Sequence, residues 1–220
     1  MEKWKKSEFQ NTCVKIEHVT KRFGEDLVLK EVNLTLKVGQ VYGVVGNNGS
    51  GKTVLMKCIC GFLPVTTGTI RVFGKEIGRD VDFPESLGVI IETPGFLTQY
   101  TGAKNLEILA DMNSKADIRL VLKKVGLDPD MKKPVGKYSL GMRQRLGIAQ
   151  AIMEDPRFLI LDEPFNGLDK HGVAEIRELL LDLKAAGKTI LLASHNDEDI
   201  RILCDHVYEM DGGVLRERTA

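Results

Sequence analysis

The chain has 220 residues with equal numbers of basic and acidic side chains, 31 Lys and Arg against 31 Asp and Glu, so its formal net charge is zero. A neutral chain has no bulk positive charge to attract a polyanion, and we expect no nucleic acid among its partners. The length suits one domain, or one core with a lobe inserted into it, and 43% hydrophobic residues is an ordinary fraction for a globular protein.

Targeting segments and cysteine spacing favour the cytosol. Residues 1–6 are mildly basic but lead into no apolar run, so we predict no signal peptide. No stretch approaches the roughly 20 apolar residues of a membrane span, so the isolated chain is expected to be soluble and to reach a membrane only through a partner. The four cysteines lack the spacing of a metal site, and we expect buried, reduced thiols. They are Cys13, Cys58, Cys60 and Cys204.

Strand patterns come first along the chain. Apolar residues alternate at period two in residues 32–36 and 70–72, with glycine turns around them, which predicts a small, partly antiparallel sheet. Continuous apolar runs are typical of strands buried on both faces of a parallel sheet. Four such runs occupy residues 41–45, 88–91, 158–161 and 190–193. The chain ends soon after this last strand signal.

Helical patterns separate these strands. Apolar residues share one helical face within residues 118–125 and again within residues 173–183, and a glycine beyond each pattern offers a stop signal. The segment from about residue 93 to residue 153 is predicted to be helical throughout, because it carries no strand signal. We interpret this segment as a helical lobe that interrupts an α/β core.

A glycine-rich loop directly follows the apolar run 41–45 and fits the pattern G-x-x-x-x-G-K-[ST] at every fixed position. The loop consists of Gly46, Asn47, Asn48, Gly49, Ser50, Gly51, Lys52 and Thr53. Its glycines let backbone N–H groups turn inward around phosphates, and the helix that follows adds the partial positive charge of its N-terminus. We expect Lys52 to reach the β- and γ-phosphates of ATP, and the Thr53 hydroxyl to ligate magnesium. A chance glycine turn is the alternative, which the flanking strand and helix disfavour.

Two other strand ends carry polar side chains that suit the second half of such a site. Asp162 and Glu163 directly follow the apolar run 158–161, and Pro164 then interrupts regular structure. We expect Asp162 to hold magnesium, directly or through water, and Glu163 to polarise the attacking water as general base. An acidic pair at a strand end is otherwise a helix cap or a surface charge. His195 follows the last apolar run, where we expect it to hydrogen-bond the γ-phosphate and the water.

With these motifs in this order, the sequence resembles the ATP-binding subunits of ABC transporters over almost its whole length. The most diagnostic stretch is residues 138–146, which line up with the family signature LSGGQ and the basic start of a helix. Ser139 and Gly141 match the signature, and the departures are Tyr138, Leu140 and Met142. Ser139 can cap the helix and leave its N-terminus free for an anion, which in the family is the γ-phosphate of ATP on the opposite subunit. The alternative is an ordinary capped amphipathic helix.

The resemblance implies roles for further residues. Phe23 is similar to the aromatic residue that stacks on adenine, and residues 166–169, ending in Asp169, resemble the loop that crosses the dimer interface. His195 resembles the switch histidine. Glu92 stands where a glutamine normally joins the core to the helical lobe and senses the transmembrane partner. A glutamate there can still ligate magnesium but cannot donate a hydrogen bond.

The motifs and the resemblance together predict the fold class. It is α/β, a P-loop NTPase (RecA-like) core with an N-terminal antiparallel β subdomain and an inserted α-helical subdomain. Residues 1–220 are expected to form a single ABC ATPase domain. The core and the β subdomain take about residues 1–92 and 154–220, and the helical subdomain takes about residues 93–153.

The function that the resemblance implies is ATP hydrolysis that drives a transporter. Two copies, or this chain and a homologous ATPase subunit, would sandwich two ATP and Mg²⁺ and move integral membrane permease subunits from the cytoplasmic side of the cell membrane. A glutamate at position 92 together with a signature of the Ser-Leu-Gly-Met-Arg type resembles the ATPase subunits of exporters for bacitracin and lantibiotic peptides. A soluble ABC-type ATPase acting on the ribosome or DNA is the alternative, although such proteins usually carry two tandem domains or a long coiled-coil insertion. A kinase or GTPase would leave the signature stretch unexplained.

Overall fold

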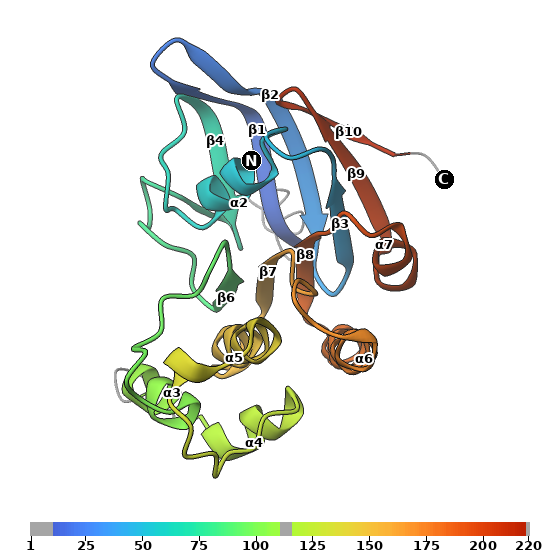
Figure 1. The fold of residues 1–220 in the computed structure, drawn as a ribbon. Helices are drawn as coiled ribbons and strands as arrows, with labels where there is room; N and C mark the ends of the chain where they lie inside the picture. Colours follow the sequence, from blue (N-terminus) through green and yellow to red (C-terminus); the bar gives the residue numbers. More distant parts are fainter. Residues whose placement is uncertain (1–10, 111–115, 219–220) are drawn as a thin grey trace.

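The first sheet is antiparallel and is built from the amino-terminal strands. The computed structural model (Figure 1) describes residues 11–110 and 116–218, so the basic start of the chain and the prediction about a signal peptide lie outside the described residues. The strand order is β2 (Asp26–Lys37), β1 (Thr12–Phe23), β4 (Thr67–Val72) and β5 (Lys75–Glu76). Every second residue of β2 from Val32 to Leu36 is buried, which is the alternation that predicted this sheet.

The second sheet has six strands in the order β10-β9-β3-β8-β7-β6, parallel except at β10. Their bounds are β3 (Val41–Val45), β6 (Leu87–Ile90), β7 (Phe158–Asp162), β8 (Thr189–Ala193), β9 (His206–Asp211) and β10 (Val214–Glu217). The four predicted strands are confirmed, but in β6, at the edge of the sheet, Leu87 and Val89 are only partly buried. Two further strands, β9 and β10, follow the last strand that the sequence predicted. In β9 only Met210 is fully buried, so this strand lacks the continuous apolar run by which the others were recognised.

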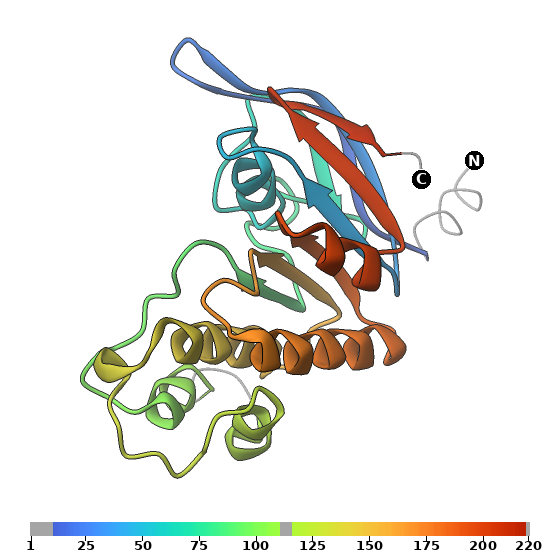
Figure 2. The same cartoon turned by 45° about the vertical axis from the view of Figure 1, so that its right-hand side comes forward.

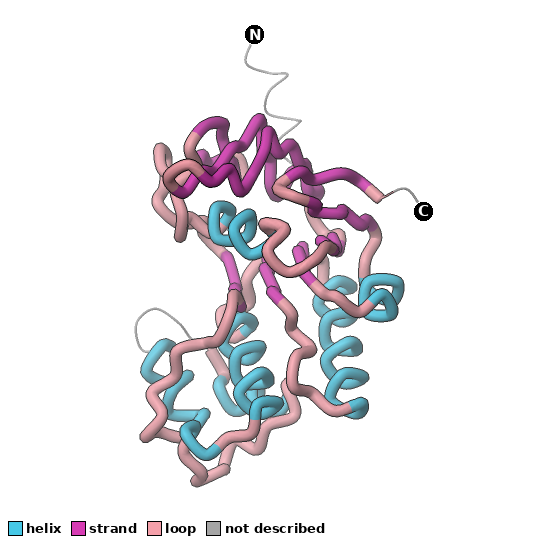
Figure 3. The backbone as a smooth tube through the Cα atoms, turned by 45° about the horizontal axis from the view of Figure 1, so that its top comes forward, coloured by secondary structure: helices cyan, strands magenta, loops and turns pink. Residues whose placement is uncertain are grey.

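The central strands are buried on both faces. Leu159 and Leu161 of β7 belong to one hydrophobic cluster, whereas Phe158 and Ile160 belong to the other. The second cluster lies between the two sheets and includes the buried face of α2 (Lys52–Ile59), which is enclosed there in Figure 3. The carboxyl end of β3 and the start of α2 are thereby held in a rigid layer, which fixes the loop between them.

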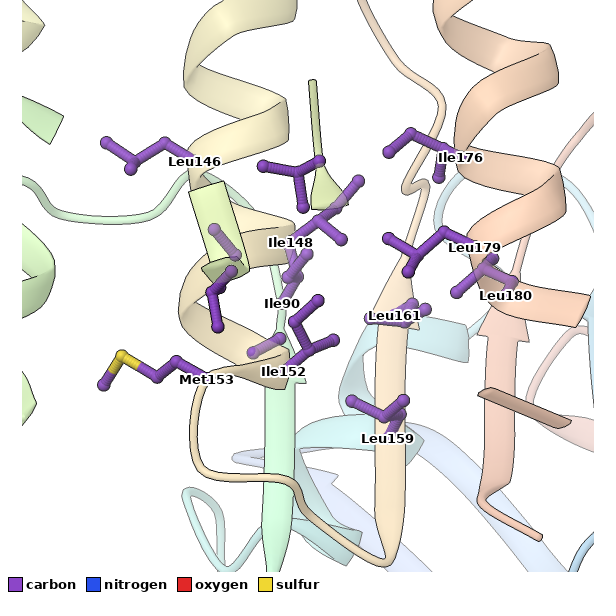
Figure 4. Packing of buried hydrophobic residues seen from close by; sticks show 14 of the residues in the cluster. Ile90, Leu146, Ile148, Ile152, Met153, Leu159, Leu161, Ile176, Leu179 and Leu180 are labelled. Atoms are coloured by element: carbon purple, nitrogen blue, oxygen red, sulfur yellow. The ribbon is translucent and has the colours of Figure 1, made fainter. Parts of the chain in front are cut away.

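Helices lie on the other side of the six-stranded sheet. They are α3 (Gly102–Ala110), α4 (Ile118–Lys124), α5 (Leu140–Ile152), α6 (Lys170–Ala185) and the short α7 (Asp197–Leu203). Figure 2 shows α5 and α6 side by side under the sheet, with α3 and α4 beyond them. In Figure 4, Ile148 and Ile152 of α5 point toward Ile90 and Leu161, and α6 adds Leu179 and Leu180 from the other side. Because α5 packs on the sheet, the helical lobe is anchored to the strands that end at the site.

The segment 93–153 is less helical than expected. Residues 93–101 form turns and loop before α3, and a short 3₁₀ helix, Val135–Lys137, precedes α5. None of the described residues of this segment belongs to a named strand, as predicted. Across residues 11–110 and 116–218 no helix is long and apolar enough to cross a bilayer. All four cysteines are free thiols, three of them buried and Cys204 partly buried.

Candidate functional site

The glycine-rich loop leaves the end of β3 and enters α2 at Lys52. Gly46, Gly49 and Gly51 have φ angles of 146°, 79° and 113°, a region that other residues rarely adopt. Gly46 also has no room for a side chain, because a Cβ there would stand 2.2 Å from the carbonyl oxygen of Met210 in β9. The backbone of β9, a strand that the sequence did not predict, therefore packs directly against the glycine-rich loop.

Lys52 and Thr53 both turn toward this loop and the neighbouring strand. The Lys52 ammonium donates to the carbonyl oxygens of Gly46 and Asn47 at 2.6 and 3.0 Å. The Thr53 hydroxyl donates to Oδ2 of Asp162 at 2.7 Å. A cavity of about 340 Å³ opens here; its lining is Val28, Asn48, Gly49, Gly51, Lys52, Thr53, Val54, Asp162 and Glu163. The structure thus brings the predicted loop and both predicted carboxylates to one space.

Glu163 lies one residue beyond β7 and is held by its neighbours. Its backbone N–H donates to the carbonyl oxygen of Ala193 at 2.9 Å, and its own carbonyl accepts from Nε2 of Gln144 at 3.3 Å. Its carboxylate lies 2.8 Å from Nδ1 of His195. The φ angle of Glu163 is +50°, a left-handed conformation that costs a non-glycine residue about 1–2 kcal/mol. The surrounding contacts hold that conformation, as they commonly do in active sites.

Glu92 follows β6 and has the same unusual backbone, with φ +59°. Its carboxylate accepts from the ammonium of Lys57 at 2.7 Å. Glu92 lines a second cavity, of about 460 Å³, together with Asp162 and Glu163. Sequence reasoning missed both Lys57 and Gln144. Lys57 could have been identified from its spacing of four residues from Thr53, because that spacing puts the two side chains on one face of α2.

The signature stretch begins α5 as predicted. Ser139 caps the helix, and its hydroxyl accepts from the N–H of Met142 at 3.2 Å. A Cβ at Gly141 would stand 2.7 Å from the carbonyl oxygen of Gly167, so only glycine allows this approach of the two loops. Leu140 contacts Gly167 from the same side and is 56% exposed. The signature is therefore an exposed helix N-terminus seated on the loop 166–169.

Three other predicted residues take positions around this centre. Tyr138, a departure from the family signature, is buried, and its hydroxyl accepts from the N–H of Gly102 at 3.2 Å, which ties α5 to α3. Asp169 caps α6 by accepting from Gly172 N–H at 2.8 Å. Phe23 is 45% exposed at the β1–β2 turn, and its ring lies 4.8 Å from the ammonium of Lys21. Phe23 lines neither cavity, so its contact with adenine stays a prediction.

The oxygen ligands around the 340 Å³ cavity suit a hard cation that is bound together with phosphate. One hydroxyl and two carboxylates, from Thr53, Asp162 and Glu163, line the smaller cavity. Within residues 11–110 and 116–218 no three carboxylate, imidazole or thiol groups converge into a metal cluster. Mg²⁺ takes one or two protein oxygens and completes its shell with water and substrate phosphates, so these residues fit magnesium with a nucleotide.

A phosphate-cradling loop between a buried strand and a helix, with carboxylates at the next strand ends, defines a P-loop NTPase. Residues 29–166 match the family described as ABC transporter. The chain belongs to this family, as its ATP-binding subunit and ATPase, which confirms the resemblance drawn from the sequence.

Three known proteins show how close the likeness is. The bacitracin transport ATP-binding protein BcrA of Enterococcus faecalis is 43% identical over 209 residues, covering 93% of this chain and 68% of that protein. The lantibiotic transport ATP-binding protein SrtF of Streptococcus pyogenes is 37% identical over 209 residues, covering 93% and 90%. The fold is similar to a dimeric, post-hydrolysis structure of the ATP-binding cassette MJ0796 bound to ADP and Pi, with a TM-score of 0.83, 24% identity and coverage of 94% and 98%.

Proposed function

We propose that the chain is one half of an ATP-gated pair, with each ATP held between the phosphate loop of one subunit and the signature of the other. The observation that carries this proposal is the position of the signature. Ser139 and Gly141 stand at an exposed helix N-terminus, and neither is among the described residues that line the 340 Å³ cavity with Lys52 and Thr53 or the 460 Å³ cavity with Glu92. A second subunit, identical or homologous, would bring its signature to that cavity.

Each residue of the half-site has a proposed task in hydrolysis. The loop N–H groups and Lys52 bind and orient the triphosphate, and Thr53 and Asp162 are the magnesium ligands. Magnesium held by these two side chains would supply positive charge that offsets the negative charge of the triphosphate. Glu163 accepts the proton of the attacking water, and His195 fixes the carboxylate of Glu163. Fixed groups aimed at the reacting phosphate lower the barrier without reorganising during the reaction.

The transport role proposed for the pair follows its relatives. BcrA and SrtF are named for bacitracin and lantibiotic transport, and this chain is similar to both over most of its length. We infer that it binds integral membrane permease subunits at the cytoplasmic side of the membrane and drives export of a peptide antibiotic. Glu92 begins the segment that leads into the helical lobe, and we infer that it senses the permease contact.

Purification from native membranes tests this function. The tagged chain, extracted in mild detergent, should bring with it a subunit with about six hydrophobic spans, identified by mass spectrometry. Cells that express the complex should tolerate more bacitracin or lantibiotic than cells with a Lys52→Ala chain. Recovery of ribosomal proteins or DNA in place of a permease would favour the soluble ATPase instead.

A further inference from the structure

Two contacts lie one helical turn apart along α2. Thr53 and Lys57 are four residues apart, so their side chains share a face of the helix. The hydroxyl of Thr53 donates to Asp162 at the end of β7, and the ammonium of Lys57 pairs with Glu92 just beyond β6, each at 2.7 Å. Because β6 and β7 are neighbouring parallel strands, the two contacts run side by side.

Glu92 has room to leave its contact. Its side chain is 64% exposed, whereas that of Lys57 is 26% exposed and fixed along α2. The carboxylate lines the same 460 Å³ cavity as Asp162 and Glu163, and Lys57 is not part of that lining. Lys57 itself lies one turn of α2 from Thr53, about 5.4 Å along the helix axis.

The positive charge of Lys57 stabilises the Glu92 carboxylate beside α2. Three carboxylates face one cavity, and each has its own contact: Thr53 for Asp162, His195 for Glu163 and Lys57 for Glu92. Carboxylates that approach one another repel, and a neighbouring ammonium offsets that repulsion. Lys57 therefore sets how readily the Glu92 carboxylate joins the other two.

We propose that Lys57 is a positioning residue that holds the Glu92 carboxylate away from the divalent-cation site and releases it when that site is filled. This inference rests on the magnesium site of Thr53 and Asp162 proposed above. Lys57 and the cation compete for one carboxylate. Glu92 thereby moves between α2 and the cation site.

The test compares nucleotide affinity with and without the metal. The dissociation constant of a fluorescent ATP analogue is measured in Mg²⁺ and in EDTA, and the ratio of the two constants gives the metal-dependent gain. Lys57→Met should increase this gain roughly two- to fivefold, the size of an exposed ion pair, because Glu92 is no longer held back. Lys57→Arg should keep the wild-type gain. In a Glu92→Gln background, Lys57→Met should change nothing.

Two controls separate this inference from the site on which it rests. Lys184 pairs with Asp205 at 2.5 Å, and Asp205 accepts from Val41 at the other end of β3, so Lys184→Met should leave the gain unchanged. Thr53→Val should lower the gain; a full gain in this variant would overturn the magnesium site, and the inference with it. If Thr53→Val loses the gain but Lys57→Met acts equally with and without Glu92, only the positioning role of Lys57 is overturned.

Discussion

Nδ1 of His195 lies 2.8 Å from Oε2 of Glu163, across the carboxyl ends of two neighbouring parallel strands. The register places Asp162, the last residue of β7, opposite Ala193, the last residue of β8, so the side chains just beyond them meet. The histidine side chain is 72% exposed and the glutamate 24%. The imidazole therefore covers the glutamate from the solvent side and fixes the direction of its carboxylate.

Removing that imidazole should slow hydrolysis more than it weakens binding. We expect His195→Ala to lower kcat by about 100-fold, since a general base that is free to rotate loses its alignment with the water. ATP affinity should change little, because Lys52 and the loop are intact. Steady-state phosphate release and nucleotide binding give the two values. His171→Ala, an exposed histidine of α6, is the matched control, and equal losses in both variants would contradict the role of His195.

The contact between the phosphate loop and β9 predicts a difference between two glycines. Gly46→Ala places a methyl group 2.2 Å from a carbonyl oxygen of β9, and we expect a loss of about 1–3 kcal/mol in the free energy of unfolding. Gly49→Ala, in the same loop, meets nothing within 4 Å and should cost only the strain of its φ of +79°, about 1 kcal/mol. Chemical denaturation without nucleotide measures both. Equal losses would show that β9 does not constrain the loop.

The signature offers a test of the shared site. Ser139→Arg places a long cation at the exposed N-terminus of α5, where it should obstruct the phosphate site of the opposite subunit. Hydrolysis should fall to background, although ATP still binds the unaltered loop of each chain. Mixing this variant with Glu163→Gln should restore activity, because one site of each mixed pair then has both an intact signature and an intact base. Normal hydrolysis by Ser139→Arg alone would rule out the shared site.

Buried thiols make the free energy of unfolding depend on pH in the alkaline range. Burial raises the pKa of the Cys13 and Cys60 thiols from 9.0 to about 12, since the thiolate is poorly solvated there. Their contribution to stability is complete below pH 9 and is lost as the pH rises toward 12. The free energy of unfolding should therefore fall above pH 9, by up to about 1.4 kcal/mol per pH unit for each thiol. Cys60→Ala should have a shallower slope in denaturation at pH 9–11, and an unchanged slope would contradict this account.

The sequence predicted the centre of the site because its side chains sit at fixed offsets from strongly patterned strands. Gly46 to Thr53, Asp162, Glu163 and His195 each follow an apolar run, and parallel strands bring their carboxyl ends to one edge. The contact of Lys57 with Glu92 carried no such pattern, because it depends on the order of β6 and β7 in the sheet. β9 escaped prediction since its partly exposed residues lack an apolar run, yet its backbone supports the loop at Gly46.

The most direct test of a paired site with Glu163 as its base uses Glu163→Gln. The amide keeps the shape of the side chain but cannot accept the proton of the water, so turnover should fall by at least about 100-fold. Light scattering after size exclusion, with ATP and Mg²⁺ present, should show a stable dimer of the variant, and a monomer without nucleotide. Rapid hydrolysis, or a monomer that stays monomeric while ATP is bound, would contradict the account.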